Sequence, residues 1–188
     1  MLNRTAVAAA VVAALACTTT LLAEGTERFS FTVANAPQTA LPGEDRLELT
    51  IHQWSTDAER DKVMQVLEEN DQATINHTFR TGPTAGSIRW PGGLQYTVRY
   101  ARRTARADGG ADIVLVADSR MWVWWDAPYK TGLEDPFTVI QLRVDKDGHG
   151  IGKLSTPDKI KADSNAGVLA AEFDSTPELL TDVKMERG

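Results

Sequence analysis

Alternation of apolar and polar residues is the feature of this sequence that most limits its fold. In residues 29–33 the apolar side chains Phe29, Phe31 and Val33 fall at every second position, and residues 47–51 repeat the pattern. A period of two is typical of a β-strand with one buried face. Further strand-length segments are predicted at residues 87–90, 95–102, 112–117, 137–144, 150–155, 168–173 and 179–185.

Short turns separate most of these segments. Asp and Gly gather at residues 108–110 and 145–148, and Pro with Gly at residues 91–93. Connections this short join antiparallel neighbours, because a parallel crossover needs a dozen or more residues. We therefore expect an α+β or mainly β domain with an antiparallel sheet of about eight strands, arranged as a curled sheet, a sandwich or a partial barrel.

One helix is clearly specified, near residues 57–69. Thr56 and Glu59 have the spacing of a capping box, and an apolar stripe follows them. A weaker helical turn or two is predicted around residues 75–79. We expect the first helix to cover one side of the sheet, within a helical insertion near residues 56–80.

The first 23 residues have the pattern of an export signal. Arg4 is followed by an uncharged run from Thr5 to Ala23. Its apolar core, residues 6–16, is shorter than the roughly 20 residues of a membrane-spanning helix. We expect cleavage after Ala23 and a periplasmic or extracellular location, with no transmembrane segment in the mature chain; an uncleaved anchor is the second choice.

Cys17 supports an alternative processing route. It is the single cysteine of the chain, and the preceding residues 14–16 partly resemble the cleavage box of a lipoprotein. Under that alternative the protein is lipid-anchored through Cys17. Under cleavage after Ala23 the mature chain has no thiol and forms no disulfide.

Length and charge limit the organisation and the partners of the mature chain. Residues 24–188 suit a single domain. The net charge of the whole chain is −6, and removal of Arg4 with the signal makes it more negative. This charge argues against nucleic acid and anionic membrane surfaces as partners.

A tryptophan-rich stretch, residues 121–126, is the first candidate binding site. If it forms a strand, Trp122 and Trp124 share one face, while Trp125 lies on the other. Indole rings combine a flat apolar area with an N–H donor, so Trp122 and Trp124 are candidates to line a groove for a glycan or apolar ligand. The alternative is that one face fills the core and a loop or the helix covers the other.

An arginine cluster is the second candidate. Arg99 and Arg102 begin it, and Arg103 and Arg106 follow in an otherwise acidic protein. Guanidinium groups suit a carboxylate or phosphate ligand, which makes Arg99 and Arg102 candidate ligand-binding residues. Solvated hairpin charge, or ion pairing with Asp and Glu, is the alternative.

No catalytic, metal or cofactor site is predicted. Residues 145–150 partly match a calcium loop, but the distal Glu is missing and a hairpin turn explains them. His52, His77 and His149 are scattered without metal-ligand spacing. No serine lies in a Gly-x-Ser-x-Gly motif.

Three segments carry a resemblance: WSTDAERD at residues 54–61, DPFTVIQLR at 135–143 and DGHGIGK at 147–153. Together they resemble a group of small exported bacterial proteins of unknown function. The resemblance implies bacterial export and a single domain, and it carries no active site.

Three functions are consistent with the sequence. The preferred one is a non-enzymatic binding or envelope-associated module whose partner is a small molecule, a glycan or a protein. The second is a secreted enzyme of the hydrolase class, whose site is assembled from distant carboxylates or His52. The third is a component that docks on a partner protein.

Overall fold

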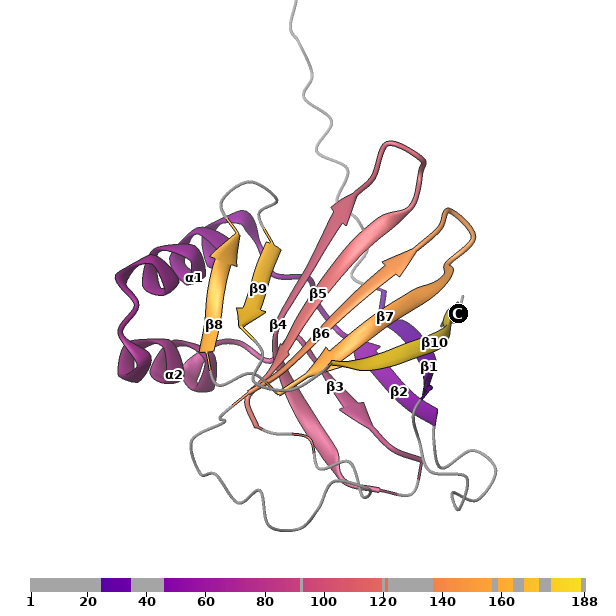
Figure 1. Cartoon of the computed structure of the whole chain (residues 1–188), viewed down its shortest axis with the longest axis horizontal. Coiled ribbons are helices and arrows are strands. Elements are labelled where there is room, and N and C mark those ends of the chain that lie inside the picture. The colour runs from indigo at the N-terminus through magenta and orange to yellow at the C-terminus, as the bar shows by residue number, and fades with distance from the viewer. Residues whose placement is uncertain are drawn as a thin grey trace, which may run out of the picture.

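Eight antiparallel strands close into a barrel in which chain neighbours pair with each other (Figure 1). In this computed structural model the described residues are 25–34, 46–91, 93–119, 121, 137–156, 159–163, 168–172 and 177–186. The expected antiparallel sheet of about eight strands is confirmed, and its arrangement is the barrel. The barrel strands are β1 (Glu27–Val33), β2 (Arg46–Ile51), β3 (Gly86–Arg89), β4 (Gln95–Ala105), β5 (Ala111–Ala117), β6 (Thr138–Val144), β7 (His149–Ser155) and β10 (Glu178–Glu186).

Strand β1 closes the barrel because it pairs on both sides. Phe29 lies opposite Leu49 of β2 and opposite Met185 of β10. The alternating side chains of β1 and β2 point into the barrel, where Phe29, Phe31 and Leu49 are at most 1% exposed. An eight-stranded barrel is just wide enough for side chains to fill. Apolar side chains therefore occupy the interior.

Two insertions interrupt the barrel order. Helices α1 (Asp57–Glu69) and α2 (Gln72–Thr81) lie between β2 and β3, and the hairpin of β8 (Lys159–Asp163) and β9 (Val168–Glu172) lies between β7 and β10. The predicted capping box begins α1: the Thr56 hydroxyl accepts from Glu59 N at 3.2 Å, and the Glu59 carboxylate accepts from Thr56 N at 2.7 Å. Asn70 ends this helix in a left-handed conformation.

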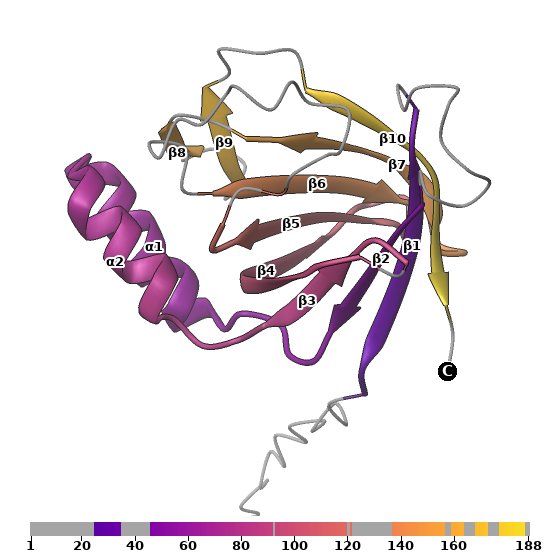
Figure 2. The ribbon, with the colours of Figure 1, turned by 90° about the horizontal axis from the view of Figure 1, so that it is seen from below.

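The helices and β8 cover the outer face of β4, β5 and β6 (Figure 2). This face is apolar as well, so the strands are buried on both sides. This second core, called the outer core below, contains Val63 and Leu67 of α1, Ile75 and Phe79 of α2, Tyr100 of β4, Val114 and Val116 of β5, Phe137, Val139 of β6 and Ile160 of β8.

Residues 168–173 were predicted to form a strand, and the structure has β9 there. This strand pairs with β8, which was not predicted, in a separate two-stranded sheet. The reason is that β7 already pairs with β6 and β10, which leaves no free barrel edge for β9. The weak helical turns around residues 75–79 belong to a full helix, α2.

A β-bulge in β4 reverses which residues face the interior. The register of β4 against β5 shifts between Val98 and Tyr100. Before the shift Tyr96 and Val98 pack in the barrel; after it Ala101 does, while Tyr100 packs in the outer core. An extra residue in one strand exchanges its two faces. Arg103, two positions after Ala101, therefore lies on the interior side at the end of the barrel.

No helix of the described residues is long and apolar enough to span a lipid bilayer.

The outer core predicts that Phe79 anchors the helices to the barrel. Its ring, 3% exposed, packs edge-on against Phe137 at 5.1 Å and Tyr100 at 6.4 Å between ring centroids. We expect Phe79→Ala to lower the free energy of unfolding by about 3–5 kcal/mol, measured by urea denaturation. Phe79→Leu, which refills part of the cavity, should cost less. A loss below about 1 kcal/mol for Phe79→Ala would contradict this packing.

Burial of Tyr100 predicts a loss of stability at alkaline pH. Burial raises the pKa of the Tyr100 phenol above its ordinary value of 10.0. The unfolded chain then releases this proton at a lower pH than the folded protein, so stability falls as the pH rises above about 10. We expect Tyr100→Phe to lose less stability than the parent protein in that range. Equal alkaline losses in urea titrations of the two proteins would refute the assignment.

Candidate functional site

The barrel wall lacks a strand beside the second half of β4. Strand β3 has 4 residues and pairs with residues 95–98 of β4, whereas β4 has 11 residues and runs on to Ala105. On its other side β3 pairs with residues 48–51 of β2. Beyond these pairs, at the end of the barrel formed by the β4–β5 and β6–β7 hairpins, the wall between β2 and β4 is not a strand.

The segment between β2 and α1, residues 52–56, bridges this gap. Ser55 N donates to Ala101 O at 2.7 Å, and Ala101 N donates to the Ser55 hydroxyl at 3.1 Å. On the other side His52 N donates to Ala85 O at 2.8 Å. The segment is therefore attached to β4 through one residue, Ser55, and Trp54 beside it packs against the barrel core.

An open cleft lies between this segment and the β4–β5 hairpin. Its volume is about 380 Å³, at the lower end of the range for small-molecule sites. Trp54 and Ser55 form one side, Arg102, Arg103 and Ala105 come from β4, and residues 109–111 come from the hairpin and the start of β5. None of the described residues that line this cleft is acidic. The guanidinium groups of Arg102 and Arg103 are the only charged side chains among these described lining residues.

Glu27 connects Trp54 to Arg103 beside the cleft. Trp54 Nε1 donates to Glu27 Oε1 at 2.8 Å, and Arg103 Nη1 donates to Glu27 Oε2 at 3.1 Å. The Arg103 guanidinium carbon lies 5.9 Å from the centroid of the Trp54 ring, within the range of a cation–π contact. Each member of this triad is held by the other two.

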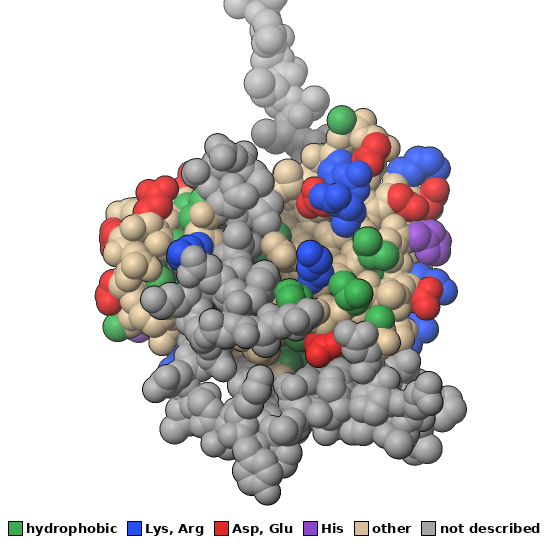
Figure 3. All heavy atoms as spheres, in the orientation of Figure 1, with side chains coloured by type: hydrophobic (Ala, Val, Ile, Leu, Met, Phe, Trp, Pro, Cys, Tyr) green, Lys and Arg blue, Asp and Glu red, His purple; other side chains and the backbone are tan. Residues whose placement is uncertain are grey.

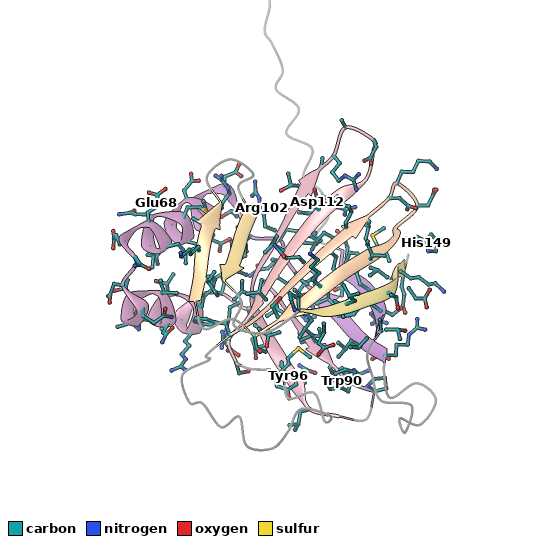
Figure 4. All side chains as sticks on the ribbon, in the orientation of Figure 1. Glu68, Trp90, Tyr96, Arg102, Asp112 and His149 are labelled. Atoms are coloured by element: carbon teal, nitrogen blue, oxygen red, sulfur yellow. The ribbon has the colours of Figure 1, made fainter. Side chains whose placement is uncertain are left out.

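Arg102 joins the cleft to the helical layer. Its Nη2 donates to Asp57 Oδ1 at 2.6 Å, and its Nη1 donates to Ser55 O at 3.2 Å. Asp57 is the first residue of α1. Figure 4 shows Arg102 between the α1, β8 and β9 layer and the β4–β5 hairpin, with Trp90 and Tyr96 at the opposite end of the barrel.

The backbone of β4 contributes hydrogen-bonding groups to the cleft. Ala101 directs its N–H and C=O away from β5 and toward Ser55. Alternate residues of an antiparallel strand direct these groups to the same side. Because the register from Ala101 to Ala105 is regular, the N–H and C=O groups of Arg103 and Ala105 point away from β5 as well, on the cleft side.

The structure separates the two arginines that the sequence singled out. Arg99 lies outside the cleft lining, where it pairs with Asp118 at 2.7 Å and donates to Gly82 O at 3.2 Å. Arg102 lines the cleft. Each arginine of the cluster forms an ion pair: Arg106 with Asp108, and Arg102 and Arg103 with Asp57 and Glu27. Acidic and basic side chains lie side by side over the hairpin end of the barrel (Figure 3).

The remaining candidate residues are not among the described residues that line the cleft. Trp122 and Trp124 lie outside the described residues. Residues 145–148 form the β6–β7 turn, in which Asp145 Oδ1 accepts from Asp147 N at 2.8 Å and from His149 N at 3.0 Å. Among the described residues no group of three or more His, Cys, Asp or Glu side chains is placed to hold a metal ion.

Sequence reasoning missed Trp54 and Glu27 as site residues. Trp54 stands two residues before the helix cap and Glu27 at the start of the first strand, and neither lies in a motif of known chemistry. Trp54 and Glu27 are 27 positions apart, and Arg103 is 76 positions from Glu27. A solitary tryptophan beside a predicted helix start was the one available signal.

The attachment of the 52–56 segment predicts a structural role for the Ser55 hydroxyl. Ser55→Ala leaves the N–H of Ala101, which is 0% exposed, without its partner. We expect a loss of about 1–3 kcal/mol in the free energy of unfolding, measured by urea denaturation. Ser87→Ala, at a half-buried serine of β3, is the control and should cost less than about 0.5 kcal/mol. Equal effects of the two substitutions would contradict the role of Ser55.

No protein-family model, curated protein or solved structure matches this chain.

Proposed function

We propose that the protein is an exported bacterial binding protein whose cleft between Trp54 and the β4–β5 hairpin holds a small molecule. The observation that carries this proposal is the open cleft of about 380 Å³ lined by one indole ring and two guanidinium groups. Small-molecule sites combine mostly apolar walls with a few polar groups that orient the ligand. This cleft has both kinds of group.

The composition of the walls supports a ligand with a flat apolar body. The Trp54 ring, Ala105 and the small residues at 109–111 form apolar or backbone surfaces. The arginines and the outward-pointing backbone groups of β4 supply donors and acceptors at the rim. By contrast, the barrel interior is filled by apolar side chains. The cleft is therefore the better place for a small molecule to bind.

The chemistry of the described lining residues supports binding rather than catalysis. They contain no His, Asp, Glu or Cys, and their one hydroxyl, that of Ser55, accepts a hydrogen bond from Ala101 N. A guanidinium group stays protonated and does not serve as a general base. The export part of the proposal comes from the uncharged run of residues 5–23 after Arg4, which lies outside the described residues.

Because Arg103 lines the cleft, we expect removal of its charge to weaken ligand binding. A thermal-shift screen of the chain against aromatic carboxylates, phosphorylated sugars, neutral glycans and fatty acids should give a ligand that raises the melting temperature. A ligand at a hundredfold excess over its Kd stabilises the folded state by about 2.7 kcal/mol. We expect Arg103→Gln to lower the affinity for that ligand by about tenfold or more, since a charge-assisted hydrogen bond is lost.

Arg143→Gln is the matched control for this screen. Arg143 pairs with Asp112 at 2.9 Å on the outer surface of the barrel, so the substitution removes the same charge outside the cleft. The Arg143→Gln variant should bind the ligand with the affinity of the parent protein. Equal weakening by the two substitutions, or a screen in which no compound stabilises the protein, would count against the proposed function.

A further inference from the structure

The Glu27 carboxylate lies beside the cleft and bridges two of its lining residues. Its two oxygens accept from two different donors, the indole N–H of Trp54 at 2.8 Å and the guanidinium of Arg103 at 3.1 Å. Trp54 and Arg103 both line the cleft, and they reach it from segments that the fold brings together. The pair is a preformed oxyanion-binding site, held by a residue of the protein itself.

We infer that the ligand of the cleft is an aromatic oxyanion, a carboxylate or a phosphate ester, whose acidic group replaces Glu27 on Trp54 and Arg103. This inference rests on the proposed function, which it makes more specific. The flat body of such a ligand would lie against the Trp54 ring, and its charge would neutralise Arg103. Glu27 then acts as an internal competitor that keeps the two donors paired in the empty cleft.

The contacts of Glu27 are of a kind that a ligand can displace. Glu27 is 29% exposed and Arg103 38% exposed, so water screens their ion pair. Exposed ion pairs contribute little to stability. Among the described contacts Glu27 engages Arg103 through a single N–H, whereas a free carboxylate or phosphate can bind a guanidinium through two parallel N–H groups.

The other charges around the cleft are already balanced. Arg102 pairs with Asp57 at 2.6 Å, and Arg106 pairs with Asp108 at 2.5 Å. Glu27 is therefore the carboxylate that neutralises Arg103 among the described ion pairs. Its departure toward solvent leaves Arg103 as the uncompensated cation, and this is the charge that an anionic ligand meets.

The experiment follows the indole N–H of Trp54 by NMR in the full chain labelled with ¹⁵N. The sequence has five tryptophans, and Trp54→Phe identifies the Trp54 cross-peak by its loss. Benzoate is titrated into the parent protein, Glu27→Gln and Glu48→Gln. Glu48→Gln is the matched control, because it removes a carboxylate paired with Arg89 at 2.7 Å outside the cleft. Benzamide is the neutral counterpart of benzoate, and phenyl phosphate distinguishes a phosphate from a carboxylate ligand.

We expect benzoate or phenyl phosphate to move the Trp54 cross-peak. Glu27→Gln should lower the half-saturating concentration by about threefold to tenfold, as loss of a partly exposed competing charge predicts, and Glu48→Gln should leave it unchanged. Benzamide should bind more weakly than benzoate, and Glu27→Gln should leave its half-saturating concentration unchanged. If Glu27→Gln does not fold, as judged by the dispersion of its amide spectrum, Glu27→Ala takes its place with the same expectation.

Failure of the inference is distinguishable from failure of the proposed function. Equal affinity for benzoate in the parent protein and both variants would overturn the role of Glu27 and leave a binding cleft. Movement of the Trp54 peak by benzamide but by neither anion would overturn the ligand class alone. A Trp54 peak that none of the three compounds moves, in the parent protein or in Glu27→Gln, would overturn the inference. A thermal-shift screen in which no compound stabilises the protein would overturn the proposed function as well.

Discussion

Burial of apolar side chains inside a closed barrel is the interaction on which the rest of the structure depends. Beyond Glu27 at the rim, the interior positions of β1 and β2 carry apolar residues whose side chains are almost completely removed from solvent. The interior therefore supplies the main hydrophobic stabilisation. Because it is filled, a binding site has to lie at the wall or the rim, and the cleft beside Trp54 does so.

The helical insertion explains why the cleft lies where it does. The chain leaves β2 at Ile51, passes through two helices, and returns as the short strand β3. Since β3 reaches only as far as Val98 of β4, the chain leading into α1 has to complete the wall, and it places Trp54 at the opening. The helices thus both cover the outer face of the barrel and position one side of the site.

Local patterns predicted the elements, and long-range contacts decided the site. Alternation in residues 29–33 and the capping box at Thr56 are readable because strands and helix starts depend on nearby residues. Closure of the barrel through the pairing of Phe29 with Met185 could not be predicted in this way, since no local signal specifies it.

The bulge in β4 explains part of what was missed at the site. A strict alternation that starts at Tyr96 would direct Arg102 to the interior side and Arg103 to the outside. The bulge exchanges these two faces, which brings Arg103 to Trp54 and directs Arg102 toward Asp57. One inserted residue therefore decided which arginine meets the indole.

Closure of the barrel by its first and last strands also bears on how the chain reaches this structure. The contacts between β1 and β10 join residues from opposite ends of the sequence, and such contacts form slowly because a long loop has to close first. Until β10 arrives, β1 and β7 each present an unpaired edge, which is a template for association with other chains. Any state in which β10 is unpaired is thus exposed to aggregation, and completion of the barrel removes that hazard together with both edges.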